Sequence, residues 1–126
     1  MKLRIRDDTI RLRLGRSEVA RVARGEAVWA ATHVAGRVFA YGLVPDPSVT
    51  ALAARFDGDR LTVHVPCDEA RAWATGEAVG LSGAQAEPGG HRLALLVEKD
   101  FACLKPREGE DESDAFPHPD AGTHTC

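Results

Sequence analysis

The 126-residue chain has no long uninterrupted apolar run and few aromatic side chains, which make up 6% of the sequence. A membrane-spanning helix needs about 20 consecutive apolar residues, and a secretory signal needs a shorter apolar stretch of its own. At the amino terminus charged and apolar residues alternate instead, as Met-Lys-Leu-Arg-Ile-Arg. We therefore expect a cytoplasmic protein with no membrane association.

Cysteine is also scarce. Cys67, Cys103 and Cys126 are odd in number and form no C-x-x-C pair, which argues against a disulfide framework and against a zinc ribbon. The sequence contains no Gly-rich phosphate loop, no G-x-S-x-G motif and no H-E-x-x-H motif. These absences favour a protein without nucleophilic or zinc-protease chemistry.

What the chain does contain is typical of one soluble globular domain, with 44% hydrophobic and 28% charged residues. Its net charge of -3 is unevenly distributed. Most of the charged residues in 2–16 are basic. From Glu98 to the end, acidic residues outnumber basic ones. The basic start and the acidic end can neutralise each other within the fold or between chains.

Two strands at the start of the chain are predicted by strict alternation of apolar and charged residues, in 2–6 and 10–14. Asp7-Asp8 fits a two-residue turn between them. A turn that tight places Ile5 opposite Ile10, Arg4 opposite Arg11 and Lys2 opposite Arg13. Because like charges that face each other weaken a hairpin, an anionic group or water should lie over this face.

The same pattern occurs twice, 51 positions apart (residue 10 to residue 61). In each copy a hairpin precedes a short helix, with Ser17 and Asp68 as the expected N-caps and with Gly25 and Gly76 at the helix ends. Two further strands follow each helix. We predict an α+β fold in one domain, 1–126, built from pseudo-repeats 1–45 and 49–98. Each repeat is a strand-strand-helix-strand-strand unit, and together they form a curved antiparallel sheet or a barrel with two short helices.

An acidic C-terminal segment, 99–126, departs from the strand pattern and is rich in Pro, Gly and carboxylates. Its apolar residues argue against a free tail. We expect the segment to pack back onto the domain through Phe101, Leu104 and Phe116, with the residues from Asp120 onward frayed.

This C-terminal segment also carries a family resemblance. The chain resembles a family of small bacterial proteins that is defined only as a domain of unknown function. The resemblance implies a bacterial, cytosolic, single-domain protein, and it implies no activity and no functional residue. It rests on Glu98-Lys99-Asp100-Phe101-Ala102-Cys103-Leu104, Arg107, Gly109-Glu110-Asp111, Asp114, Phe116-Pro117, the Met-Lys-Leu-Arg-Ile start and Leu12-Arg13-Leu14.

In architecture alone the two halves resemble the triphosphate tunnel enzymes, which hold a triphosphate and metal inside a barrel. The opening strand, 2–6, lacks the alternating glutamates that bind metal in that family. Similar architecture does not carry function.

The candidate anion-binding residues are the basic residues of the opening hairpin and two residues of the second half. Arginine forks match phosphate oxygens, so this face suits an anionic ligand or protein. The negative net charge and the lack of an aromatic platform argue against nucleic acid. The alternative is a solvated face, or one neutralised by the chain's own acidic segment. The residues are Lys2, Arg4, Arg11, Arg13, Arg55 and His64.

Residue types alone suggest two candidate metal sites. Cys103, His118, His124 and Cys126 have the donor inventory of a structural zinc site, although their spacing is not a standard one. Residues 108–114 hold several carboxylates that suit calcium or magnesium, without EF-hand spacing. The sequence identifies no cofactor and no oligomeric state.

We interpret the chain as a non-enzymatic binding or interaction module whose Arg-rich strand face meets an anionic partner or its own acidic segment. One alternative is a structural zinc protein that uses the C-terminal Cys and His residues. Another is a metal-dependent enzyme acting on a phosphorylated substrate, with Glu98, Asp100, Asp111 and Asp114 as metal ligands.

Overall fold

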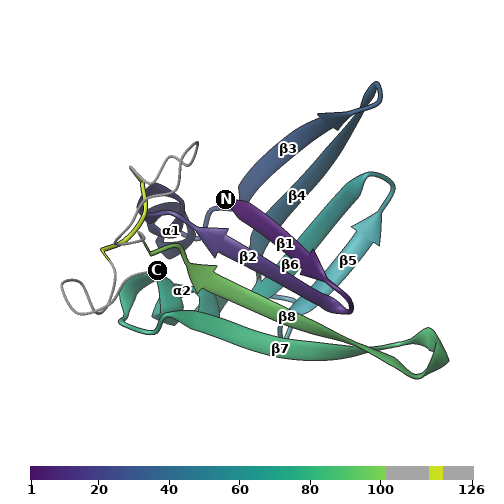
Figure 1. Cartoon of the computed structure of the whole chain (residues 1–126). Helices are drawn as coiled ribbons and strands as arrows, with labels where there is room; N and C mark the ends of the chain where they lie inside the picture. The colour runs from purple at the N-terminus through teal and green to yellow at the C-terminus, as the bar shows by residue number, and fades with distance from the viewer. Residues whose placement is uncertain (102–113, 118–126) are drawn as a thin grey trace.

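The computed structural model describes residues 1–101 and 114–117 of the chain. Within that part, eight strands form two four-stranded sheets and two α-helices lie together at one end of them (Figure 1). The predicted α+β class is confirmed. The sheets do not close into a barrel. None of the helices in the described ranges is long and apolar enough to cross a membrane.

Both halves follow the predicted order of strand, strand, helix, strand, strand. The elements of the first half are β1 (Lys2–Arg6), β2 (Thr9–Leu14), α1 (Arg16–Ala23), β3 (Val28–Val34) and β4 (Arg37–Asp46). Those of the second half are β5 (Ala53–Asp57), β6 (Arg60–Pro66), α2 (Cys67–Thr75), β7 (Gly80–Glu87), a 3-10 turn η1 (Pro88–Gly90) and β8 (His91–Lys99).

The opening hairpin has the predicted register. Arg4 pairs with Arg11, Ile5 with Ile10, and the turn is Asp7-Asp8. Asp7 adopts a positive φ of 48°, a conformation that Asp tolerates better than most residues. The alternation therefore places the apolar residues of β1 and β2 on one face of the sheet and the basic residues on the other.

The expectation of antiparallel pairing throughout was wrong, because both sheets are mixed. Their orders are β1-β2-β8-β7 and β3-β4-β6-β5, and the two central strands run parallel in each. Leu12 lies beside Val97 in one sheet, and Leu43 beside Val63 in the other. Each sheet thus combines one hairpin from each half of the chain. The turns that define hairpins are local, whereas the pairing of distant hairpins depends on tertiary packing.

The core lies between the inner faces of the two sheets and against the helices. Trp73 of α2 is its largest fully buried side chain, and Val19 and Val22 of α1 are also buried. The hairpin tips lie at the opposite end from the helices (Figure 1). Buried residues from the strands complete the core: Ile10, Leu12, Leu14, Val28, Leu43, Leu61, Val63, Val65, Leu95 and Val97.

The helix starts differ from the predicted ones. The N-cap of α1 is Gly15, whose N–H donates to the Glu18 carboxylate at 3.0 Å, and α2 begins at Cys67 after Pro66. Ser17 is not a cap. It lies inside the first turn, and its hydroxyl donates to Asp114 at 2.6 Å. The long-range bonds to Asp114 and the hydrogen bond from the Gly15 N–H to Glu18 outweighed the local preference of Ser for the cap position.

A short segment, 114–117, holds the start of α1 in place. The Arg16 N–H donates to the Asp114 carbonyl at 2.8 Å, and the Ser17 N–H donates to the Asp114 carboxylate at 3.2 Å. The Phe116 ring lies 5.6 Å from the Phe101 ring, and the Phe116 N–H donates to the Asp100 carbonyl at 2.7 Å. Leu104, the third apolar residue that was expected to pack back, lies outside the described residues. The residues that were expected to fray, from Asp120 onward, also lie outside them.

Candidate functional site

The six candidate anion-binding residues lie on two different sheets. Lys2 and Arg4 of β1 and Arg11 and Arg13 of β2 share the outer face of their hairpin, opposite the buried leucines. Arg55 and His64 lie instead on β5 and β6 of the other sheet. The structure therefore brings four of the six together and separates the other two from them.

Carboxylates at the end of β8 cover one half of this basic face. The Lys2 ammonium lies 3.1 Å from the Asp100 carboxylate, and an Arg13 guanidinium nitrogen lies 3.6 Å from the same group. Arg11 Nε lies 3.1 Å from a Glu98 carboxylate oxygen. Near the helices, Glu98 and Asp100 thus form ion pairs with three basic side chains of the hairpin.

The other half of the face, toward the turn, forms what we call the anion pocket. It is a shallow hollow of about 170 Å³ lined by Arg4, Arg6, Thr9 and Arg11. Within residues 1–101 and 114–117, neither Arg4 nor Arg6 has an ion-pair partner. Three guanidinium groups and one hydroxyl can together donate several hydrogen bonds to a phosphate, sulfate or carboxylate group.

Sequence reasoning missed two members of the anion pocket. Arg6 shares the face of Lys2 and Arg4 by the same alternation, so the signal for it was present. Thr9 was missed because the second strand was expected to begin at residue 10, whereas it begins one residue earlier.

His64 belongs to a separate polar cluster. Its Nδ1 lies 3.0 Å from the Asp46 carboxylate, and the other oxygen of that carboxylate accepts hydrogen bonds from the Ser48 hydroxyl at 2.6 Å and the Ser48 N–H at 2.8 Å. These bonds, the Ser48 hydroxyl first and His64 last, hold the pKa of Asp46 below its usual value. The cluster ties the end of β4 to β6, so a structural role explains His64.

Replacing Asp46 by Asn should reveal this coupling as a pH-dependent loss of stability. Because the folded-state pKa is lowered, the carboxylate stabilises the fold above its ordinary pKa of 3.8, and this contribution is lost as the pH falls through the lower folded-state value. We expect Asp46→Asn to melt below the wild type at pH 7, and the two melting temperatures to converge below pH 3.8.

Thermal melts followed by circular dichroism across pH 2–8 would measure this difference. In a Ser48→Ala background the same substitution should have a smaller effect, because the largest cause of the lowered pKa is gone. A difference that persists unchanged at low pH would show that the carboxylate charge is not the source.

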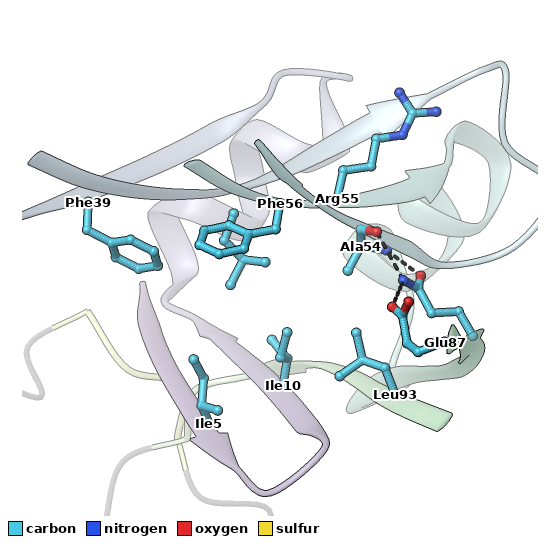
Figure 2. Close-up of a pocket in the computed structure, with 10 residues that line it drawn as sticks. Ile5, Ile10, Phe39, Ala54, Arg55, Phe56, Glu87 and Leu93 are labelled. Carbon is cyan, nitrogen blue, oxygen red and sulfur yellow. Dashed lines mark hydrogen bonds between the residues drawn. The ribbon is translucent and has the colours of Figure 1, made fainter. Parts of the chain in front are cut away.

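A second hollow lies between the two sheets at their open end, and we call it the inter-sheet cleft (Figure 2). Its volume is about 310 Å³. Ile5, Ile10 and Leu93 reach into it from one sheet, and Phe39 and Phe56 from the other. It is lined by Ile5, Ile10, Phe39, Ala54, Arg55, Phe56, Leu61, Gln85, Glu87 and Leu93.

The polar atoms at one end of the cleft bond to the chain itself. The Gln85 side-chain amide donates to the Ala54 carbonyl at 3.1 Å and to the Glu87 carboxylate at 2.8 Å, and it accepts from the Ala54 N–H at 2.7 Å. Arg55 points away from the cleft (Figure 2). The surface that the cleft offers to a ligand is therefore mainly hydrocarbon.

Lys99 is a buried cation that sequence reasoning did not single out. It is 6% exposed, and its ammonium donates to the Gly76 carbonyl at the end of α2 at 2.8 Å. The charge also lies over the rings of Trp73 and Phe116. Burial lowers its pKa, and the charge of Glu77 opposes that shift. A cation at a helix C-terminus satisfies an orphan carbonyl, so Lys99 acts as a cap.

The metal-site hypotheses fall largely outside the described residues. Cys103, His118, His124 and Cys126 all lie there, and so does Asp111. Within the described ranges no group of three or more His, Cys, Asp or Glu residues is placed to hold a metal ion. Of the carboxylates considered for the enzyme alternative, Glu98 and Asp100 form ion pairs with basic side chains, and Asp114 accepts hydrogen bonds from Ser17.

Comparison with known proteins supplies a family and no activity. No curated protein and no solved structure matches the chain. One family model, described as a family of unknown function, matches residues 1–120. The opening strands and the C-terminal motif resembled a domain of unknown function, and the match confirms that resemblance. The chain therefore belongs to the family of unknown function DUF7009.

Proposed function

We propose that the protein is a non-enzymatic binding module whose anion pocket binds an oxyanion group such as phosphate. The observation that carries the proposal is the pairing pattern of the basic hairpin. Lys2 and Arg13 are matched with Asp100, while Arg4 and Arg6 project from the same strand pair without an ion-pair partner in the described part of the chain.

The ion pairs near the helices support this role by fixing the position of Arg11. Its Nε is held by Glu98 at 3.1 Å, so the remaining guanidinium N–H groups are available to a ligand beside Arg4. An arginine held by a carboxylate loses less side-chain entropy when a ligand binds, because part of its freedom is already lost. The pocket is thus partly organised before an anion arrives.

The proposal also covers the origin and location of the protein, its internal duplication and its partner. The family resemblance implies a bacterial, cytoplasmic protein. The two sheets support an internal duplication, since Leu12 and Val63, 51 positions apart, occupy equivalent central positions and face Val97 and Leu43. The partner of the basic face is an anionic ligand, or the acidic segment of the chain itself.

Titration with inorganic phosphate at low ionic strength, followed by calorimetry, tests the proposal. A hydrogen bond between charged groups contributes about 1.5–3 kcal/mol, so Arg4→Ala or Arg6→Ala should weaken binding about tenfold to a hundredfold. The binding should also weaken as salt increases. Arg24→Ala is the matched control, because that exposed arginine lies at the end of α1 and pairs with Glu26.

The results separate the alternatives. Phosphate binding that Arg4→Ala and Arg6→Ala leave unchanged would overturn the proposal. The proposal would also be overturned if phosphate bound neither to the full chain at low salt nor to a chain that ends at residue 117. The shorter chain lacks part of the acidic segment.

A further inference from the structure

The anion pocket and the inter-sheet cleft share one edge strand. Ile5 of β1 lines the cleft, and its neighbours Arg4 and Arg6 line the anion pocket on the other face of the same strand. We propose that the two hollows take one ligand, an anionic single-chain amphiphile, with its alkyl chain in the cleft and its head group on Arg4 and Arg6. This inference rests on the proposed function, because it names the class of ligand that the anion pocket holds.

The lining of the cleft suits a flexible hydrocarbon chain. Phe56 is 71% exposed and Ile5 is 59% exposed, and they lie on opposite sheets at its open side. A methylene group takes up about as much room as a water molecule, about 30 Å³. A cleft of about 310 Å³ therefore accommodates a chain of about ten carbons. Burying such a chain removes both its own surface and these two side chains from water.

The charges around the cleft favour an anionic head group at the β1 end. Arg4 and Arg6 flank Ile5 there and line the anion pocket on the other face of β1. Glu87 is the carboxylate that lines the cleft, and it lies at the far end from Ile5, where Gln85 donates to it (Figure 2). Asp7 and Asp8 form the hairpin turn, and Asp8 lies 3.4 Å from His91. The charged side chains that line the anion pocket are thus all arginines, and the carboxylate that lines the cleft lies at its other end.

The edge position of β1 makes one continuous ligand feasible. Among the residues that the structure describes, no strand pairs with the outer side of β1, so an alkyl chain leaving the cleft beside Ile5 can bend over the strand to the basic face. The side chains of Arg4 and Arg6 are long, exposed and free to reach the same edge. A central strand would block this path with its neighbour.

Binding of alkyl phosphates measures both parts of the site. Calorimetry would compare inorganic phosphate, butyl, octyl, decyl and dodecyl phosphate and the neutral decanol, each kept monomeric in solution. Each methylene that enters the cleft should tighten binding about fourfold, and the gain should stop near ten carbons. Decanol should bind at least tenfold more weakly than decyl phosphate, because it lacks the charge that Arg4 and Arg6 recognise.

Variants of exposed residues test the cleft without disturbing the core. Ile5→Ser combined with Phe56→Ser should weaken decyl phosphate binding at least tenfold and leave inorganic phosphate unaffected. Val79→Ser is the matched control, since Val79 is an exposed apolar residue outside the cleft lining. Thermal melts would verify that the wild type and both variants remain folded.

The outcomes distinguish this inference from the proposed function. If phosphate binds through Arg4 but affinity does not rise with chain length, the inference fails and the proposed function stands. If neither phosphate nor decyl phosphate binds, both fail. If decanol and decyl phosphate bind equally well, the proposal that the ligand is an anionic amphiphile is overturned. It is also overturned if anionic phospholipid vesicles capture the protein while no monomeric alkyl phosphate binds.

Discussion

Replacing Trp73 by Ala should lower the free energy of unfolding by about 3–5 kcal/mol, a large part of the total stability of a small domain. Trp73 is 1% exposed at the centre of the core, where α2 meets the strands. Its indole N–H donates to the Val79 carbonyl at 3.1 Å, and the Lys99 ammonium lies 5.8 Å from its ring centre. The substitution opens a cavity, removes one of the two hydrogen bonds that the Val79 carbonyl accepts, and uncovers a buried cation.

Trp29 provides the matched control, because it is the other tryptophan of the chain. It is 43% exposed, and its ring lies against Gly42 with the Arg60 guanidinium 5.2 Å away. Trp29→Ala removes surface packing and one exposed cation–π contact, for an expected cost of about 1 kcal/mol. Urea unfolding followed by circular dichroism would compare the two variants. Equal losses would contradict the placement of Trp73 at the centre of the core.

A methyl group added at Gly15 should detach the segment 114–117 from α1 and cost about 3 kcal/mol, roughly 1 kcal/mol for each of three hydrogen bonds. A Cβ at this position would lie 2.8 Å from the Asp114 carbonyl oxygen and closer still to the Asp114 carboxylate. That carbonyl accepts from the Arg16 N–H, and the carboxylate accepts from Ser17. Gly15 itself has an ordinary extended backbone, with φ of -74°, so the effect comes from the contact and not from strain.

Unfolding by urea would measure the loss, and limited proteolysis would show whether the segment is released. Asp114→Asn is a useful comparison, since it keeps the backbone carbonyl and the side-chain acceptor while removing the charge near the helix N-terminus. It should cost less than Gly15→Ala and should leave residues 114–117 protected. Gly15→Ala with wild-type stability and protection would show that the segment does not depend on this close approach.

The sequence determined the local structure of the chain. Alternation at period two, joined to the two-residue turn Asp7-Asp8, allows one register for β1 and β2, because a shift by one residue would turn every apolar side chain to the solvent. Glycine after α1 and α2 ends both helices as expected. The basic face of Lys2, Arg4, Arg11 and Arg13 follows from the same alternation, and so this surface can be predicted from the order of residues alone.

Only the tertiary structure decided which distant parts meet. The parallel contacts of β2 with β8 and of β4 with β6 are not encoded by any turn, since they depend on the way in which four hairpins bury their apolar faces against each other and against Trp73. The same packing places Asp100 over Lys2, separates Arg55 and His64 from the basic face, and brings Ile5 across from Phe56. A local pattern fixes the face on which a side chain lies, and long-range burial fixes what that face meets.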